Sequence, residues 1–268
     1  MASPNQVTVS QLQRLVGTPD CPVLIDVCID QDFALDPRII PTSKRHAFQN
    51  IKELVPVLLG KRVVVVCQKG LKLSVGASAI LRSEGVTAEY LEGGIFAWKA
   101  AGAPLVPEAS IPISRDTNRS VWVTRHRPKV DRIACPWLIR RFVDRNASFL
   151  FVEPSQVEAV AEKFGATEFD TKSSFWGHRG GDCTFDTMLS EFQLHTLPLR
   201  RVAGIVRAAD SNKLVEVSEA AGILAVLLGL SRMYKDDLKQ LEAGIQLFDA
   251  VYRWSRDAVD EKHDSQVV

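Results

Sequence analysis

Short runs of apolar residues alternate with helix-like segments in the first hundred residues. The runs PVLIDV (22–27) and KRVVVVC (61–67) are typical of strands covered on both faces, since consecutive valines leave no polar face for solvent. Segments with helical spacing and a terminal glycine follow at 48–60, 72–85 and 95–102. Strands that alternate with helices predict βαβ units and a mostly parallel sheet.

The pattern becomes mainly helical in the second half of the chain. Two brief apolar runs, VWVT (121–124) and SFLFV (148–152), predict strands. Helical periodicity then dominates in four segments, 154–165, 199–210, 218–229 and 236–254. The whole pattern predicts an α/β domain over 1–107, a linker over 108–120 rich in proline, serine and charge, a helix-rich α+β domain over 121–256, and a polar tail over 257–268.

Composition narrows the classes of function. The 268 residues carry 33 Lys plus Arg against 32 Asp plus Glu, and a net charge of +1 gives no overall reason to expect nucleic acid as a partner. The first residues lack the basic start and apolar run of a secretion signal, and no stretch is apolar enough for a membrane span. Five cysteines at irregular spacing do not form a disulfide framework, so we expect a cytoplasmic protein.

Cys67 is the candidate nucleophile, because it ends a buried strand and is followed by the loop QKGLKLS and a helix. If Gln68 to Lys72 wrap around the sulfur, successive backbone N–H groups point at it, and the following helix adds its positive N-terminal end. Both effects stabilise a thiolate. The alternative is a cysteine that merely packs in the core at a strand end.

The loop residues have separable roles in this prediction. Gly70 supplies the backbone freedom of a tight turn. Lys69 and Lys72 add positive charge suited to an anionic sulfur donor, and the main chain of Gln68 and Leu71 completes the predicted anion cradle.

At these residues the chain resembles the rhodanese-like family. The resemblance rests on Cys67-x-x-Gly70-x-Lys72-x-Ser74, on the ending YLEGGIFAWKAAGAPL (90–105), and on LIDV, whose Asp26 usually helps to hold the active loop in that family. It implies a rhodanese-like parallel sheet flanked by helices and a sulfurtransferase that carries sulfur as a Cys67 persulfide. The implied partners are a thiosulfate-like donor and a thiol or cyanide acceptor.

The chain departs from this family at two places. Cys28 stands where the family usually has arginine, and PRIIPTSKRHAF (37–48) replaces the usual Gly-His-Ile-Pro-Gly-Ala block. These departures bear on substrate access and on the support of the loop. The cradle is one residue shorter than in related phosphatases, which favours a sulfur-sized centre over a phosphate ester.

Two segments of the second half could carry chemistry. TRHRPKVDRIACPWLIRRF (124–142) is strongly basic, and a helix beginning near Cys135 and Pro136 would form an oxyanion site; a solvated basic surface over a core stripe is the alternative.

In SSFWGHRGGDCTFDTM, His178, Asp182, Cys183 and Asp186 lie close together and could hold zinc or iron, with Asp210, Asp236 or Asp237 completing the site. A turn with a hydrogen-bonded histidine and aspartates that cap helices explains the same residues.

The second half resembles the C-terminal domain of ChrB, a bacterial chromate-resistance family. The resemblance rests on RPKVDRIACPWLIRRFVD, GHRGGDCTFDTML, IVRAADSNKL and LLGLSRMYKDDLKQLEAGIQLFDAVYRW. It implies a link to chromate or another oxyanion, which the basic stretch from Arg125 to Arg132 could recognise.

Three functions remain open from the sequence. The first is a sulfurtransferase with Cys67 as nucleophile, linked to chromate resistance. The second is a non-catalytic sensor or binding protein in which Cys67 detects oxidants or an oxyanion. The third is a metal-dependent redox enzyme built on His178 and Cys183.

Overall fold

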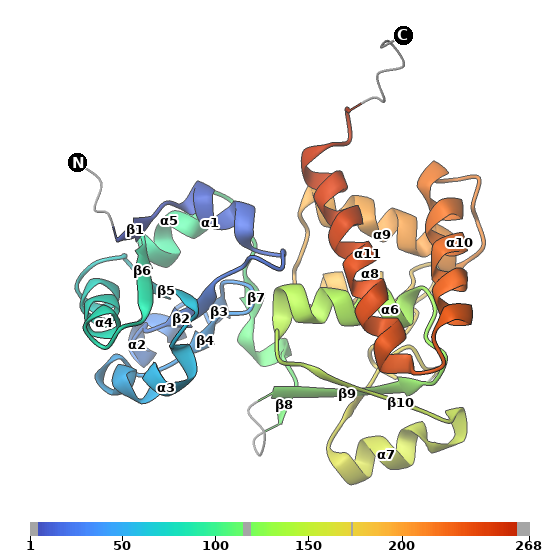
Figure 1. The fold of residues 1–268 in the computed structure, drawn as a ribbon, viewed down its shortest axis with the longest axis horizontal. Coiled ribbons are helices and arrows are strands. Elements are labelled where there is room, and N and C mark those ends of the chain that lie inside the picture. Colours follow the sequence, from blue (N-terminus) through green and yellow to red (C-terminus); the bar gives the residue numbers. More distant parts are fainter. Residues whose placement is uncertain (1–4, 115–118, 173, 262–268) are drawn as a thin grey trace. The chain divides into compact units, whose positions relative to one another are not determined.

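The computed structural model describes residues 5–114, 119–172 and 174–261. The chain divides into two compact units, one of residues 1–112 and 138–146 and the other of residues 113–137 and 147–268 (Figure 1). All five cysteines are free. None of the helices in the described part of the chain has the length and apolar character needed to span a lipid bilayer.

The first unit is built on a five-stranded parallel sheet with the order β1-β6-β5-β2-β4. Its strands are β1 (Gln6–Val7), β2 (Val23–Asp26), β4 (Lys44–Arg45), β5 (Arg62–Val66) and β6 (Thr87–Leu91). The register pairs Val23 with Val63 and Asp26 with Val66. The valines of β5 are completely buried, as expected of a central strand covered on both faces.

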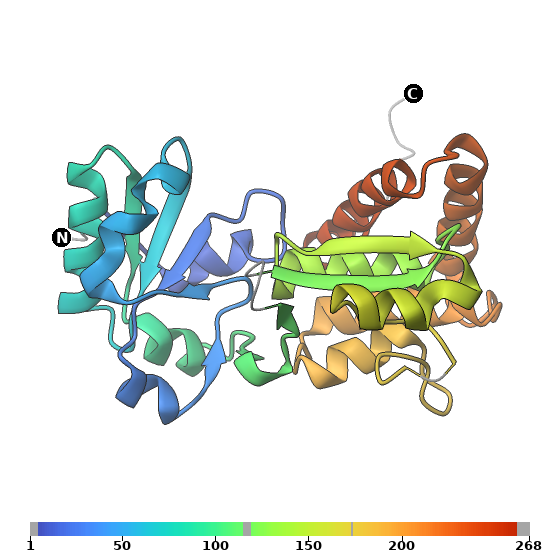
Figure 2. The same ribbon diagram turned by 90° about the horizontal axis from the view of Figure 1, so that it is seen from below.

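Helices cover both faces of this sheet, with α4 on one side and α1 on the other (Figures 1 and 2). The α-helices are α1 (Val9–Leu15), α2 (Asp30–Ala34), α3 (Val55–Leu58), α4 (Lys72–Ser83) and α5 (Gly94–Ala100). The 3-10 helices are η1 (Phe48–Leu54) and η2 (Glu108–Ser110), and η3 (Ile139–Val143) is a π-helical turn. The unit also contains a two-stranded antiparallel sheet, in which β3 (Arg38–Ile39) pairs with β7 (Val106–Pro107).

The segment 108–120, predicted as a linker, contains η2 and the strand β8 (Ile113–Ser114). β8 pairs antiparallel with the beginning of β9 (Arg119–Arg125), where Ile113 faces Ser120. Residues 115–118 of this segment lie outside the described residues, as do residues 262–268 of the predicted tail.

The second unit has a smaller parallel sheet with the order β10-β9-β11, and β8 pairs with β9. Its other strands are β10 (Ser148–Val152) and β11 (Thr167–Glu168). The helices are η4 (Pro154–Gln156), α6 (Asp131–Leu138), α7 (Val157–Phe164), α8 (Thr184–Glu191), α9 (Leu197–Asp210), α10 (Ser218–Met233) and α11 (Asp237–Asp257). In Figure 1, α7 lies on one face of the sheet and α6 with α11 on the other.

Trp137 is the centre of the helical core of the second unit. It is fully buried, and its ring lies 5.6–6.3 Å, between centroids, from those of Phe185, Phe248 and Tyr252. Its indole N–H donates to Asp249 Oδ1 at 2.8 Å, which satisfies the polar atom of an otherwise apolar side chain. The predicted fold class, a parallel sheet flanked by helices and then a mainly helical α+β domain, is confirmed.

Candidate functional site

Cys67 lies immediately after β5, at the carboxyl end of the central strand, and is 4% exposed. The chain then passes through the loop 68–71 before α4 begins at Lys72. Chemistry at the carboxyl ends of parallel strands is a general property of α/β sheets, because the loops that connect strand to helix all lie there.

The amino end of α5 binds this loop through main-chain hydrogen bonds. The amide of Ile95 donates to the carbonyl of Cys67 at 3.1 Å, and that of Phe96 donates to the carbonyl of Gln68 at 3.0 Å. In a trans peptide the C=O and the next N–H point in opposite directions. Because the two carbonyls face α5, the amides of Gln68 and Lys69 point away from it.

Three glycines make this close approach possible. Gly70, Gly93 and Gly94 all have positive φ, from 60° to 66°. A Cβ atom on Gly70 would lie 2.5 Å from the carbonyl oxygen of Leu91, and one on Gly94 would overlap the carbonyl of Cys67. The glycines therefore allow the left-handed backbone conformation, and they leave room for the loop and the helix to approach each other closely.

The sulfur of Cys67 lies 3.1 Å from the hydroxyl of Ser74, in the first turn of α4. Ser74 is completely buried, whereas Lys69, Leu71 and Lys72 are exposed. Within the described residues, no main-chain amide of the loop forms a hydrogen bond to the sulfur, so the amide cradle stays a prediction. The hydroxyl of Ser74 is a contact that the sequence interpretation did not assign.

Asp26 supports the neighbouring strand end. Its carboxylate accepts from the amide of Cys28 at 2.8 Å, and its main-chain carbonyl accepts from the amide of His46. Burial raises the pKa of the Asp26 carboxyl and of the Cys28 thiol. The side-chain hydrogen bond of Asp26 thus goes to the turn after β2, whereas the resemblance implied support of the active loop.

Three arginines of the basic segment form contacts within the second unit. Arg125 and Arg132 both pair with Oδ2 of Asp170, at 3.1 and 3.2 Å. Arg127 donates to the carbonyls of Tyr234 and Ser231. These guanidinium groups connect elements of the second unit to one another. Their positive charge is directed at a carboxylate and at main-chain carbonyls of the same unit.

The expected helix start near Cys135 and Pro136 is wrong. α6 begins at Asp131, and Pro136 lies inside it. Proline has no N–H for the carbonyl one turn earlier, and the helix continues after Leu138 as the π-helical turn η3. The residue at the amino end of α6 is an acid, so the helix start carries an anion of its own.

His178 lies at the centre of an acidic cluster. Its Nε2 is 3.3 Å from Asp131 Oδ2, 3.6 Å from Asp170 Oδ1 and 3.3 Å from Asp210 Oδ2. The hydrogen bond with Asp131 raises the pKa of His178 to about 9. Burial, together with the charges of Asp131 and Asp170, raises the pKa of Asp210 to about 6.

The other residues predicted to accompany His178 are engaged elsewhere. Asp182 pairs with Arg207 at 3.3 Å. Cys183 and Asp186 form the capping box at the start of α8, with the thiol 3.3 Å from the carboxylate. Asp210, which the sequence offered only as a residue to complete a site, lies 3.3 Å from His178.

Asp236 and Asp237 serve the start of α11. Asp236 is its N-cap and accepts from the amide of Lys239, and Asp237 accepts from the amide of Arg127. The alternative that explains these two aspartates as structural residues agrees with these contacts.

The sequence interpretation missed Asp131 and Asp170 as members of the cluster. Asp170 follows β11, which runs parallel to β9, and Arg125 ends β9. The strand β11 was not predicted from the sequence, so no local signal placed Asp170 at a strand end.

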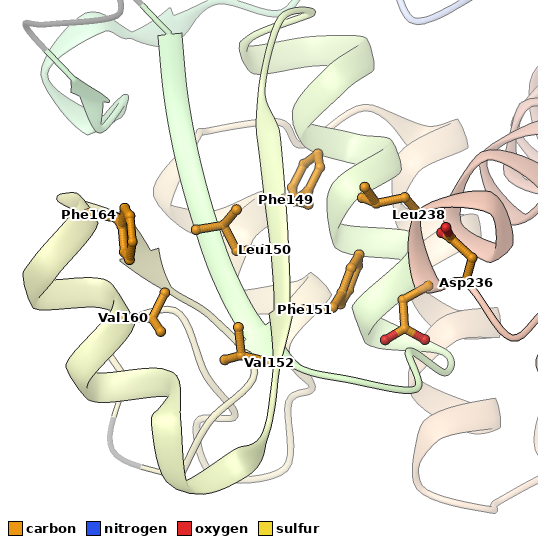
Figure 3. A pocket seen from close by; sticks show the side chains of 9 residues that line it. Phe149, Leu150, Phe151, Val152, Val160, Phe164, Asp236 and Leu238 are labelled. Carbon is orange, nitrogen blue, oxygen red and sulfur yellow. The ribbon is translucent and has the colours of Figure 1, made fainter.

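A separate apolar pocket opens between β10, α7 and the start of α11 (Figure 3). It is lined by Phe149, Leu150, Phe151, Val152, Val160, Phe164, Asp236, Asp237 and Leu238. None of these residues belongs to the Cys67 loop or to the His178 cluster, and the lining offers no nucleophile.

Two protein-family models match the chain. The rhodanese-like domain matches residues 8–101, and the C-terminal domain of ChrB matches residues 122–255. The chain is 35% identical over 133 residues to "Protein ChrB" of Cupriavidus metallidurans, a match that covers 49% of this chain and 39% of that protein. It is 36% identical over 123 residues to an uncharacterized protein of Synechocystis, covering 42% of this chain and 65% of that protein.

Solved structures resemble the first unit. A rhodanese-related protein from Thermoplasma volcanium is 22% identical, with a TM-score of 0.33, over 38% of this chain and 97% of that chain. A thiosulfate sulfurtransferase from Pseudomonas aeruginosa is 25% identical, with a TM-score of 0.32, over 38% of this chain and 19% of that chain. With the family-model match over residues 122–255, the chain belongs to the family of the ChrB C-terminal domain, and a rhodanese-like domain precedes that region.

Proposed function

We propose that the chain is a sulfurtransferase that carries sulfane sulfur as a persulfide on Cys67 and acts in chromate resistance. The observation that carries the proposal is the placement of Cys67 in a loop whose carbonyls are bound by the amides of Ile95 and Phe96. Because those two carbonyls face α5, the amides of Gln68 and Lys69 point away from the helix, and we expect them to stabilise an anion on that side.

The reaction has two steps with Cys67 as the only covalent carrier. The thiolate attacks the outer sulfur of thiosulfate; a new S–S bond forms, the old one breaks, and sulfite leaves with its electron pair. Cyanide or a thiolate then attacks the terminal sulfur of the persulfide and releases thiocyanate or a new persulfide, which restores the Cys67 thiolate.

The residues around the sulfur have distinct roles in this mechanism. The hydroxyl of Ser74 donates to the sulfur when it is anionic. Lys69 and Lys72, both exposed, attract the anionic donor, and neither forms an ion pair within the described residues. The main chain of Gln68, Gly70 and Leu71 completes the site for the donor.

The test compares thiosulfate:cyanide sulfur transfer by the full chain and by Cys67→Ser. Cys21→Ser is the matched control, because Cys21 is another buried free thiol of the same unit. We expect thiocyanate formation to disappear in Cys67→Ser and to persist in Cys21→Ser. Equal rates for the wild type and Cys67→Ser would end the proposal.

A mass spectrum after thiosulfate treatment distinguishes the sulfurtransferase from the non-catalytic alternative. A carrier gains the mass of one sulfur atom on Cys67 and loses it on addition of cyanide. A sensor that only binds an oxyanion shows a shift in melting temperature without a covalent product.

The link to chromate is supported by the match to Protein ChrB and is tested separately. We expect expression of the chain to improve growth of a sensitive bacterium on chromate, and Cys67→Ser to remove the benefit. A benefit that survives in Cys67→Ser would assign it to the second unit.

A further inference from the structure

In the His178 cluster three carboxylates meet at one ring nitrogen. A ring N–H donates one hydrogen bond to one acceptor. Here Nε2 of His178 lies within 3.6 Å of oxygens from Asp131, Asp170 and Asp210. The single N–H at Nε2 can therefore donate a hydrogen bond to one of the three carboxylates. The other two carboxylates lie close to Nε2 without a hydrogen bond from it.

Asp131 supplies the second observation. Its side chain is 1% exposed, Oδ2 accepts from the amide of Thr184 at 2.8 Å, and Oδ1 is buried with no hydrogen-bond partner. A buried carboxylate oxygen without a partner costs free energy unless a cation or a donor reaches it. Oδ2 of the same carboxylate lies 3.3 Å from His178 Nε2, so a cation bound by Asp131 beside His178 would offset the burial of this group.

The distances are close to the edges of a metal coordination sphere, and the one to Asp170 is slightly longer. With metal–ligand bonds of roughly 2.1 Å, neighbouring donor atoms lie roughly 3.0–3.4 Å apart. Asp131 Oδ2 and Asp170 Oδ1 lie 3.3 and 3.6 Å from His178 Nε2, and the three donor atoms are all within 4.8 Å of one another.

We propose that Asp131, Asp170 and His178 bind one divalent metal ion, with Asp210 beside it as a fourth acidic group. Two carboxylates and one imidazole suit a first-row ion such as Mn²⁺, Fe²⁺ or Zn²⁺. The side chain of His178 is 51% exposed, so the ion has a path from solvent and retains open positions for water or substrate.

Neighbouring side chains orient the two aspartates as outer-sphere residues do in metal sites. The hydroxyl of Thr184 donates to Asp170 Oδ1 at 3.0 Å, and Arg125 with Arg132 bind the other oxygen, Oδ2. Oδ1 of Asp170 is thereby turned toward His178. The thiol of Cys183 lies against Asp186, which leaves the proposed donor set without sulfur.

The test uses the full chain in metal-free buffer, titrated with Mn²⁺ by electron paramagnetic resonance and with Zn²⁺ by calorimetry. We expect one saturable site per chain, and nitrogen coupling in the pulsed spectrum of bound Mn²⁺. His178→Ala should weaken binding by at least about tenfold and remove the nitrogen coupling. His195→Ala is the matched control, because His195 is an exposed histidine of the same unit.

The absence of saturable binding of both ions, or equal affinities for His178→Ala and His195→Ala, would overturn the proposal. Asp131 is fully buried and binds the start of α8, so its variants can fail to fold; His178→Ala avoids that problem. Sulfur transfer by His178→Ala should match the wild type, so the metal site and the Cys67 reaction can fail independently.

Discussion

The amide of Ile95 donates a hydrogen bond of 3.1 Å to the main-chain carbonyl of Cys67. The position of the candidate nucleophile is therefore set by the first turn of a helix that comes later in the chain. Four predictions follow from this contact and from three others in the two units.

Gly94→Ala should destroy the contact between loop and helix. The new Cβ would overlap the carbonyl of Cys67 and the amide nitrogen of Gly70, at a φ of +60°. Strain and overlap together should lower the free energy of unfolding by about 3 kcal/mol or more and abolish sulfur transfer.

Gly102→Ala is the control for Gly94→Ala, since Gly102 also has a positive φ but nothing within 4 Å of an added Cβ. It should cost only about 1–2 kcal/mol and keep sulfur transfer. Urea unfolding and thiocyanate formation measure both quantities. Equal losses of activity in the two variants would contradict the role of Gly94 in shaping the loop.

Ser74→Ala should lower sulfur transfer more than it lowers stability. The hydroxyl lies 3.1 Å from the sulfur, and a hydrogen bond to a charged group is worth about 1.5–3 kcal/mol, so we expect about a tenfold lower rate. Ser78→Ala is the control, because both serines are completely buried in α4 and both hydroxyls donate to the main-chain carbonyl three residues earlier. The contact with the sulfur distinguishes Ser74 from Ser78. Steady-state rates that fall equally in both variants would argue against a role for Ser74 at the sulfur.

Gly244→Ala should destabilise the second unit. A Cβ on this residue of α11 would overlap Cγ2 of Ile133 in α6, and overpacking of this kind costs about 1–3 kcal/mol. Gly229→Ala in α10 has nothing within 4 Å and should be neutral or stabilise by up to about 1 kcal/mol. Thermal unfolding of both variants tests the packing of α11 on α6; a Gly244→Ala variant as stable as Gly229→Ala would contradict it.

The ionisation of Asp36 should make the free energy of unfolding depend on pH in the acidic range. Hydrogen bonds from Arg38 and Lys99 hold the pKa of its carboxyl well below the ordinary value of 3.8. A carboxyl with a lowered pKa in the folded state stabilises the fold above the ordinary value, and that contribution is lost as the pH falls below it.

Asp36→Asn should thus reduce the free energy of unfolding by up to about 1 kcal/mol at neutral pH, since the group is partly exposed. The difference from the wild type should shrink progressively below a pH of about 4. Urea unfolding across this range measures it, and a difference that grows in acid would contradict the assignment.

Local features of the sequence predicted β2, β5, α4 and α5 of the first unit, whereas α2, β3 and β4 were not predicted and the helix predicted over 48–60 is mostly 3-10. Four consecutive valines have no polar face, so β5 could only be a covered strand. Gly85, Gly102 and Gly165, predicted to end helices, all have positive φ. These features depend on residues next to one another in the chain, which is why a single sequence reveals them.

The second site was predicted only in part, because its members are distant in sequence. His178 was identified, but its neighbours Asp182, Cys183 and Asp186 turned out to serve α8 and Arg207. Its actual partner Asp131 lies among basic residues, and the local charge pattern suggested a solvated basic surface or an oxyanion site there. The parallel pairing of β9 with β11, which brings Arg125 to Asp170, is not encoded in local periodicity.

The path of the Cys67 loop is fixed through main-chain carbonyls and through glycines, whereas the side chains at positions 68, 69, 71 and 72 take no part in those hydrogen bonds. Substitution of these four side chains should therefore change which anion the loop binds without changing the path of its backbone. A library randomised at these four positions would sample cavities of different size and charge on one scaffold, which makes this loop a starting point for redesigning anion binding.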